Sequence, residues 1–232
     1  LFFKMRELGF NGPAILGDLN SELIRTFSAV QTDPEGVSVT LKTAYSTNTR
    51  ETFETIRAQR PSELNDLNTA ARFIYLNRTC YNGLYRVNKS GQFNTPFGAY
   101  PSPKICDDEA LIRSSLALQG TSLRSEHYGA LLNYALPTDF VYFDPPYHQL
   151  SETSNFTAFT SEGFSETDQM VLAEVVHILH GKGVRILLSN SDTPFIRNLY
   201  KRYEAISVRA PRSINSVGSK RGVVGEVIVR TY

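Results

Sequence analysis

The stretch "FVYFDPPY" at residues 140–147 places four β-forming residues before an aspartate and two prolines. A short apolar run that ends on polar or turn-forming residues is typical of a buried β-strand. Downstream, 165–183 has apolar residues at helical spacing, with Ser165 as a candidate N-cap and Gly183 as a candidate stop. A second apolar run, "VRILLSN", follows at 184–190. Strand, helix and strand in this order predict a βαβ unit.

Two further apolar runs, 14–20 and 225–232, are also predicted strands, and 21–30 after the first is a predicted helix. Strands that alternate with helices indicate a mostly parallel sheet, whose ligands gather at the carboxyl ends of the strands. Asp18 and Asp144 both stand at such ends. We therefore expect a binding site at this edge of an α/β domain.

The interval between Asp18 and Asp144 is longer than a single crossover requires. Within it, 49–59 and 63–79 have helical patterns, and 81–100 has the pattern of two short β arms around the turn "NKSG". The interval is predicted to hold an inserted small helical domain with a hairpin.

The composition is that of a soluble globular protein. Of 232 residues, 41% are hydrophobic and 20% are charged. No apolar run approaches the roughly 18 residues that a membrane span needs. Cys80 and Cys106 have no metal-like spacing, so neither a disulfide framework nor a zinc site is expected. We expect a cytoplasmic protein with no membrane association.

Positive charge is concentrated in two stretches, although the formal net charge is only +1. Residues 67–106 contain no acidic residue, and their Lys and Arg residues are interleaved with Tyr and Phe. A second basic stretch spans 197–221. Local positive charge beside aromatic rings favours a nucleic acid as the partner, with ordinary solvated helix faces as the alternative.

The tetrapeptide Asp144-Pro145-Pro146-Tyr147 joins hydrogen-bond acceptors to an aromatic ring. Proline has no N–H and a fixed φ, so the two prolines are expected to hold the loop rigid. The Asp144 carboxylate and the Pro145 carbonyl then face outward as paired acceptors. They suit a planar ring with an exocyclic amine that stacks on Tyr147, such as an adenine presented to an electrophilic methyl group. The alternative is a turn with a capping aspartate.

Three longer stretches carry a resemblance to a known family. They are "ILGDLNSELI" (15–24), "LNRTCYNGLYRVNKSGQFNTPFGAY" (76–100) and "FDPPYHQLSETSNFTAFTSEGFSETDQ" (143–169). Together they resemble the Dam-type DNA adenine-N6 methyltransferases of the α group. The likeness is collinear over nearly the whole chain.

The resemblance implies an α/β fold, namely a Rossmann-like class I methyltransferase sheet with an inserted small helical/β-hairpin DNA-recognition domain. The catalytic domain would comprise 1–30 and 109–232, and the inserted target-recognition domain 31–108. The activity implied is methyl transfer from S-adenosyl-L-methionine to the N6 of adenine in double-stranded DNA, in GATC sites. A restriction-modification role belongs to the same expectation.

The resemblance also implies roles for individual residues. Asp18 would bind the ribose hydroxyls of the donor, although capping of the following helix is an alternative role for it. Asp144 and the Pro145 carbonyl would accept from the N6 amine, while Pro146 stiffens the loop and Tyr147 stacks on the base. Asp144 would also lie near the methionine part of the donor.

By resemblance, the hairpin supplies the contacts to DNA. Arg86 is the candidate for bidentate pairing with guanine, the commonest specific contact in the major groove. The other expected DNA contacts are Arg78 and Lys89 to phosphates, Tyr81 and Asn82 near the vacated base or the backbone, Leu84 and Pro96 at a thymine methyl, and Tyr100 and Asn155. For any one of them the alternative is an exposed side chain without a role, and this reading is favoured for Lys89.

Several positions depart from the family pattern. The family's Gly-rich donor loop would precede Leu1, so we expect residues before Leu1 that the sequence given does not include. Ala99 stands where relatives often have arginine. His148 and Gln149 stand where another residue followed by proline is common, a difference expected to loosen the loop.

Two other classes of function stay open at this point. One is a catalytically inactive DNA-binding module of the same fold. The other is an enzyme that methylates a planar amine in RNA or on glutamine, but such enzymes generally carry Asn at the first position of the tetrapeptide. For the enzyme we expect a monomer without an obligate protein partner, encoded by a bacterium or a phage.

Overall fold

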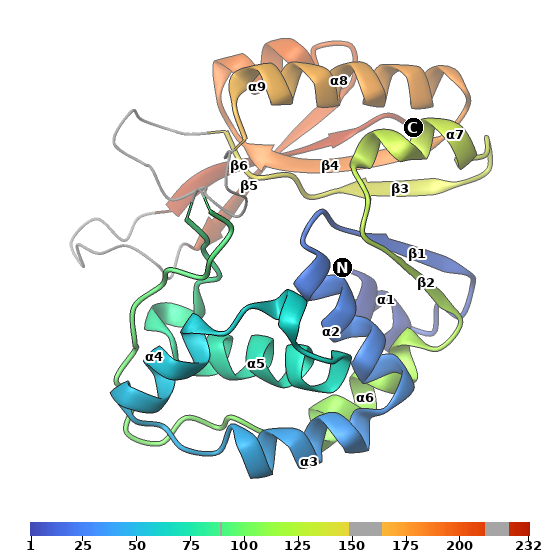
Figure 1. Ribbon diagram of the computed structural model, residues 1–232. Helices are drawn as coiled ribbons and strands as arrows, with labels where there is room; N and C mark the ends of the chain where they lie inside the picture. Colours follow the sequence, from blue (N-terminus) through green and yellow to red (C-terminus); the bar gives the residue numbers. More distant parts are fainter. Residues whose placement is uncertain (89, 149–163, 212–222) are drawn as a thin grey trace. The chain divides into compact units, whose positions relative to one another are not determined.

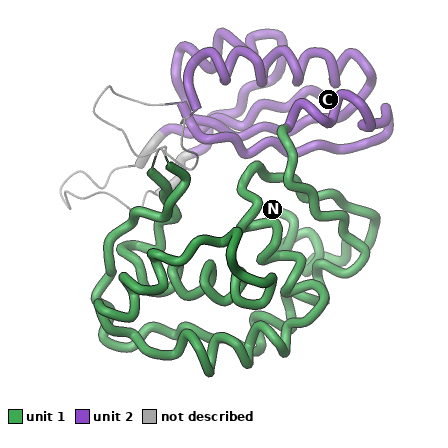
Figure 2. The backbone as a smooth tube through the Cα atoms, viewed as in Figure 1, with its two compact units in different colours: residues 1–127 green, residues 128–232 purple. Residues whose placement is uncertain are grey.

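The protein has mixed α/β secondary structure. The computed structural model describes residues 1–88, 90–148, 164–211 and 223–232. The chain forms two compact units, residues 1–127 and 128–232 (Figure 2). Each unit has its own hydrophobic core. Among the described residues, no helix is long and apolar enough to cross a bilayer.

The second unit is built on a four-stranded sheet in the order β3-β4-β6-β5 (Figure 1). Strands β3 (Phe140–Phe143) and β4 (Arg185–Ser191) are parallel, with Val141 opposite Ile186. Helix α8 (Glu166–Gly181) lies between them in the chain. These elements confirm the βαβ unit predicted from the sequence.

Strand β6 (Val223–Arg230) is antiparallel to both of its neighbours, β4 and β5 (Glu204–Pro211). The mostly parallel sheet expected from the sequence is therefore wrong for this edge. Residues 212–222 between β5 and β6 are fewer than the dozen or more that a parallel crossover requires. The predicted strand at 225–232 exists, but it returns beside β5 in the opposite direction.

Helix α8 begins and ends as its sequence predicts. The Ser165 hydroxyl accepts from the Asp168 N–H, and the Asp168 carboxylate accepts from the Ser165 N–H, which makes a capping box. Beyond the last turn, Gly183 has a φ of 89°, a left-handed conformation that glycine adopts at little cost.

The core of the second unit lies between its helices and its sheet. Leu172, Val176 and Leu179 of α8 are almost completely buried in one cluster with Ile186 and Leu188 of β4. Helices α8 and α9 (Pro194–Leu199) lie along one face of the sheet (Figure 1). The remaining helical elements of this unit are η3 (Tyr128–Ala130) and α7 (Leu131–Tyr134).

The first unit combines helices with a short parallel pair, β1 (Ala14–Gly17) and β2 (Thr121–Arg124). Its helical elements are α1 (Phe2–Glu7), α2 (Ser21–Thr32), α3 (Pro34–Ala44), α4 (Arg50–Ala58), η1 (Pro61–Glu63), α5 (Asp66–Thr79), η2 (Tyr81–Gly83) and α6 (Asp108–Leu118). Helices α2, α4 and α5 confirm the helical segments predicted before and within the long interval.

Helix α5 carries much of the core of this unit. Ala70, Ala71, Tyr75 and Leu76 on this helix are at most 1% exposed. They share one cluster with residues of α2, α3, α4 and α6. The predicted domain boundaries near residues 30 and 109 stay a prediction, and residues on both sides of them contribute to this cluster.

A buried ion pair joins α5 to α2. The Arg72 side chain is 2% exposed and that of Glu22 is 6% exposed, and the guanidinium is bonded to the carboxylate. Arg72 also donates to the carbonyls of Ile56 and Arg57 at 3.2 and 3.0 Å. Tyr85 donates its hydroxyl to the other carboxylate oxygen of Glu22 at 3.2 Å. The pair and its hydrogen bonds therefore connect four segments, namely α2, α4, α5 and the segment that contains Tyr85.

Replacing Arg72 by Met should lower the free energy of unfolding by about 3–5 kcal/mol, because the Glu22 carboxylate loses its charged partner while it stays buried. The measurement is urea denaturation followed by circular dichroism. The control is Arg113→Met, since Arg113 forms an exposed pair with Glu109 that contributes little. Equal denaturation midpoints for both variants would show that the buried pair is not a main source of stability.

Candidate active site and DNA-reading hairpin

The tetrapeptide begins where β3 ends. The exposed Asp144 follows directly after Phe143. Ser189 on the neighbouring strand β4 donates its hydroxyl to Asp144 Oδ1 at 2.8 Å, and Tyr142 Oη lies 2.9 Å from the same hydroxyl. Parallel pairing of β3 and β4 brings these side chains together at the carboxyl edge of the sheet. One carboxylate oxygen is thus fixed by the sheet.

Two buried amide side chains hold the rest of the loop. Gln169 of α8 donates Nε2 to the Pro146 carbonyl at 2.8 Å, and its Oε1 accepts from Asn190 Nδ2 at 3.1 Å. Asn190 Oδ1 accepts the backbone N–H of His148 at 2.8 Å. Gln169 is 1% exposed and Asn190 is 0% exposed. The loop is therefore attached to both α8 and β4.

His148 is fixed by its ring as well as by its backbone. The ring stacks on Phe195, with centroids 4.8 Å apart. Its Nε2 lies 3.1 Å from a Glu166 carboxylate oxygen, and its Nδ1 lies 3.1 Å from the Thr193 hydroxyl. These contacts hold His148 in place, and the loosening of the loop expected from His148 and Gln149 together stays a prediction. Gln149 lies outside the described residues.

The loop presents acceptors of the kind that the sequence predicts. Asp144 is exposed, and among the described residues no donor lies on the Pro145 carbonyl. Burial raises the pKa of the half-buried Tyr147, so its phenol stays neutral at physiological pH. The arrangement suits a planar ring with a hydrogen-bond-donating amine. The role of the tetrapeptide toward adenine stays a prediction.

Asp18 follows β1 in the first unit. Its Oδ1 accepts the N–H of Asn20 at 2.7 Å, and Asn20 itself caps α2 by accepting from Glu22 and Leu23. Capping of the helix by Asp18, the alternative role, is therefore wrong. Partial desolvation raises the pKa of Asp18, and the hydrogen bond from Asn20 opposes that rise. One carboxylate oxygen stays available for a ligand.

The hairpin predicted around "NKSG" pairs at separate points. Val87 pairs with Phe93, and Cys80 pairs with Phe97, both antiparallel and as isolated bridges. The Tyr81 N–H also donates to the Pro96 carbonyl at 2.8 Å. The two β arms therefore exist as contacts across the turn and not as a continuous ladder.

Arg86 is held in place by a residue of the opposite arm. Its Nε donates to Asn94 Oδ1 at 2.8 Å, and one terminal nitrogen donates to the Asn94 carbonyl at 3.3 Å. A guanidinium has five N–H groups, so donors remain for a base edge. Asn94 is a residue that the sequence analysis did not single out. Leu84 is half-buried in the same hairpin, and its carbonyl accepts from Thr95.

Two residues with strained backbone conformations lie at the base of the hairpin. Asn82 and Ala99 have φ values of 54° and 53°, and they are the described non-glycine residues with positive φ. Tyr100 Oη accepts the Asn82 N–H at 2.9 Å, which fixes these two turns to each other. Residues in such conformations cluster at functional sites.

Arg78 and Tyr100 share a surface groove of about 410 Å³. It is lined by Arg78, Tyr100, Pro101, Ser102, Pro103 and Lys104. Arg78 is exposed at the end of α5, whereas Lys104 pairs with Asp107 at 2.7 Å. The expected contacts Lys89 and Asn155 lie outside the described residues.

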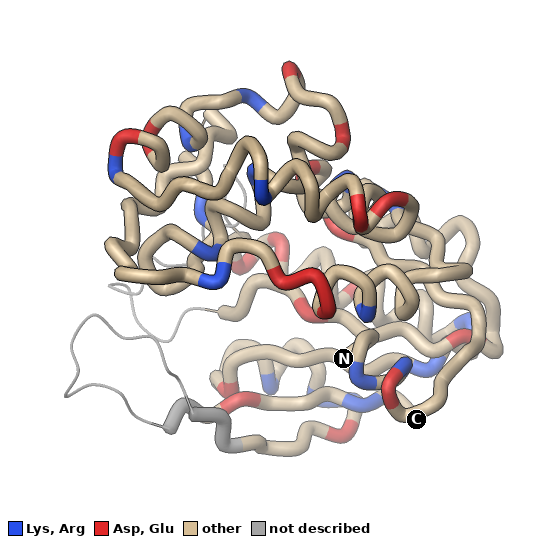
Figure 3. Tube along the Cα trace, turned by 90° about the horizontal axis from the view of Figure 1, so that it is seen from below, with Lys and Arg blue, Asp and Glu red and all other residues tan. Residues whose placement is uncertain are grey.

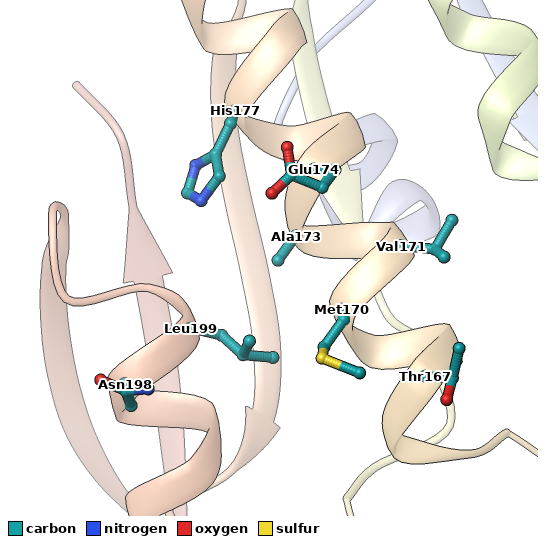
Figure 4. A pocket seen from close by; sticks show the side chains of 8 residues that line it. All are labelled: Thr167, Met170, Val171, Ala173, Glu174, His177, Asn198 and Leu199. Atoms are coloured by element: carbon teal, nitrogen blue, oxygen red, sulfur yellow. The ribbon is translucent and has the colours of Figure 1, made fainter.

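Charged positions of both signs are interspersed along the described trace (Figure 3). Another groove, of about 350 Å³, lies between α8 and α9 (Figure 4). It is lined by Thr167, Met170, Val171, Ala173, Glu174, His177, Asn198 and Leu199. No tetrapeptide residue lines this groove, so we do not include it in the candidate site.

Comparison with known proteins identifies the family. The family described as D12 class N6 adenine-specific DNA methyltransferase matches residues 2–214. The type II methyltransferase M1.LlaDCHI of Lactococcus lactis subsp. cremoris is 39% identical over 238 residues, covering 100% of this chain and 82% of the relative. The DNA adenine methylase of Escherichia coli K12 is 34% identical over 216 residues, covering 92% of this chain and 77% of the relative.

A third relative, the type II methyltransferase M.MjaIII of Methanocaldococcus jannaschii, is 34% identical over 244 residues, covering 100% of this chain and 84% of the relative. The chain therefore belongs to the D12-class N6-adenine-specific DNA methyltransferases. It is an enzyme that methylates adenine in DNA, which confirms the Dam-type resemblance and the expected methylation of adenine N6.

Replacing Ser189 by Ala should lower the methylation rate constant roughly tenfold, because Asp144 loses a hydrogen bond to its charged form. Affinity for duplex DNA should not change. The measurement is single-turnover methylation with equilibrium duplex binding. The control is Ser28→Ala, since Ser28 is exposed on α2. A wild-type rate in the Ser189 variant would show that this bond does not position Asp144 for the reaction.

Proposed function

We propose that the enzyme transfers the methyl group of S-adenosylmethionine to the N6 of adenine in GATC sites of double-stranded DNA, and that it takes the adenine out of the helix to do so. The observation that supports this most is the loop after β3. An exposed Asp144 stands beside the Pro145 carbonyl, which has no donor within the described part of the chain, on a backbone fixed by buried side chains. Such acceptors match the two hydrogens of an exocyclic amine.

The donor fits the carboxyl end of β1. Asp18 is exposed there, and the hydrogen bond from Asn20 uses only Oδ1. The other oxygen can accept from ribose hydroxyls, as an acid at a strand end commonly does for a nucleoside. S-adenosylmethionine supplies a methyl group on a positively charged sulfur. We assign Asp144 a second role beside the methionine part of this donor.

In the proposed reaction the loop orients the amine. Asp144 and the Pro145 carbonyl each accept one hydrogen from N6, which draws the nitrogen lone pair out of conjugation with the ring. Tyr147 stacks on the base and fixes its plane, and Pro146 keeps the loop rigid. The nitrogen forms a bond to the methyl carbon while the carbon–sulfur bond breaks with its electrons left on sulfur. The methylated nitrogen, which is positively charged after the transfer, then loses one proton to water and becomes a neutral amine.

The hairpin is proposed to read the DNA. Asn94 orients the Arg86 guanidinium, whose remaining N–H groups would meet guanine. Leu84 and Pro96 would contact a thymine methyl. Backbone and phosphate contacts are proposed for Arg78, Tyr81, Asn82, Lys89, Tyr100 and Asn155. We further propose that the enzyme acts as a monomer in the cytoplasm, where it reaches its DNA substrate without an obligate partner.

The test uses the full-length protein, S-adenosylmethionine and two duplexes that differ only in a GATC or a scrambled site. We expect N6-methyladenine in the first duplex alone, detected by nucleoside analysis. Asp144→Ala should abolish the product, because the amine loses its charged acceptor, while the variant should still bind the duplex. Asp66→Ala, which changes an exposed carboxylate on α5, is the control.

Each possible failure of this test has a separate meaning. Product in both duplexes would contradict GATC as the target, but not the reaction. Product from the Asp144 variant at the wild-type rate would contradict the role of the loop.

A further inference from the structure

The two prolines limit the hydrogen bonds that can hold the loop backbone to its neighbours. Pro145 and Pro146 have no backbone N–H, so neither can be fixed by donating to a neighbouring carbonyl. Side chains must therefore supply donors to the loop. The structure shows such donors at two positions: Ser189 bonds the Asp144 carboxylate, and Gln169 bonds the Pro146 carbonyl.

Gln169 and Asn190 form a chain of hydrogen bonds with only one possible direction. Asn190 Oδ1 accepts two backbone N–H groups, those of His148 and Ser191, both at 2.8 Å. Its Nδ2 must then point to Gln169 Oε1, 3.1 Å away. Gln169 Nε2 is consequently left to donate to the Pro146 carbonyl. The backbone at both ends thus fixes the orientation of both amides.

Every second residue of the loop is hydrogen-bonded to a neighbouring element. Residues 144, 146 and 148 are each bonded to β4 or α8 through Ser189, Gln169 and Asn190. Pro145 lies between two attached residues and has no donor among the described part of the chain. Gln169 occupies the Pro146 carbonyl, whereas the neighbouring Pro145 carbonyl can still accept from a substrate.

We propose that Gln169 and Asn190 are positioning residues of the methyl transfer, which fix the Pro145 carbonyl and Asp144 as a preorganised pair of acceptors. This inference rests on the proposed function of the loop. A fixed pair avoids the cost of reorganisation during the reaction, and a displacement of about 1 Å can lower a rate on the order of 100-fold. Both amides are buried, so their bonds are not exchanged for water.

The test is Gln169→Glu, which keeps the shape of the side chain. A protonated carboxyl at this position can still donate to the Pro146 carbonyl and accept from Asn190. An ionised carboxylate has no donor and repels the carbonyl oxygen. Burial raises the pKa of a carboxyl group at this position, so it should ionise at a pH at which the enzyme is active.

We expect the single-turnover rate of this variant to approach that of wild type at about pH 6 and to fall on the order of 100-fold below it at about pH 9. Duplex affinity should stay within about twofold of wild type at each pH, since no DNA contact changes. Gln119→Glu is the matched control, because Gln119 is exposed at the end of α6. Its rate relative to wild type should not depend on pH.

The outcomes separate this inference from the proposed function. A wild-type enzyme that forms no N6-methyladenine would overturn the proposed function. An active wild type with a pH-independent ratio of variant to wild type would overturn the positioning role, even if the variant were less stable. If the variant does not fold, hydrogen exchange of the His148 amide in the wild-type enzyme tests the positioning role instead. Slow exchange supports the attachment to Asn190, and exchange at the rate of a free peptide overturns it.

Discussion

The loop after β3 depends on donors that its own backbone cannot supply. Two consecutive prolines make the chain stiff, but they also remove two N–H groups from the segment that must be fixed most firmly. Ser189, Gln169 and Asn190 provide the missing attachment from α8 and β4. The parallel pairing of β3 and β4 and the burial of α8 are therefore requirements of the candidate site, because they place these three side chains beside the loop.

In the first unit, buried charged side chains fix the hairpin to the helical core. The buried pair of Arg72 and Glu22 joins α5 to α2, and Tyr85 attaches the hairpin to the same carboxylate. Burial raises the pKa of Tyr85, so its phenol remains a donor to Glu22. Next to Tyr85 in the chain, Arg86 is held by Asn94. The proposed base-reading side chain thus extends from a segment that is fixed to the core.

Local patterns in the sequence were sufficient to predict the β3–α8–β4 unit, the Ser165 cap and the helices α4 and α5. Each depends on residues that are close in sequence, such as the capping box of Ser165 and Asp168. The antiparallel direction of β6 was not predicted, because apolar strands carry no direct signal of their direction. Gln169, Asn190 and Asn94 were also missed, since their roles arise from contacts between distant segments. A signal did exist for two of them: Gln169 interrupts the apolar face of α8, and Asn190 is a buried polar residue near the end of the apolar strand β4.

The central claim is that Asp144 and the Pro145 carbonyl accept from the N6 amine of an extruded adenine. It is tested most directly with duplexes in which the target adenine is replaced by purine, which lacks that amine. With S-adenosylhomocysteine bound, wild type should bind the adenine duplex more tightly than the purine duplex, by roughly tenfold, because the acceptors are left unpaired. Asp144→Asn should reduce this difference. Equal affinity of the wild-type enzyme for both duplexes would contradict the account.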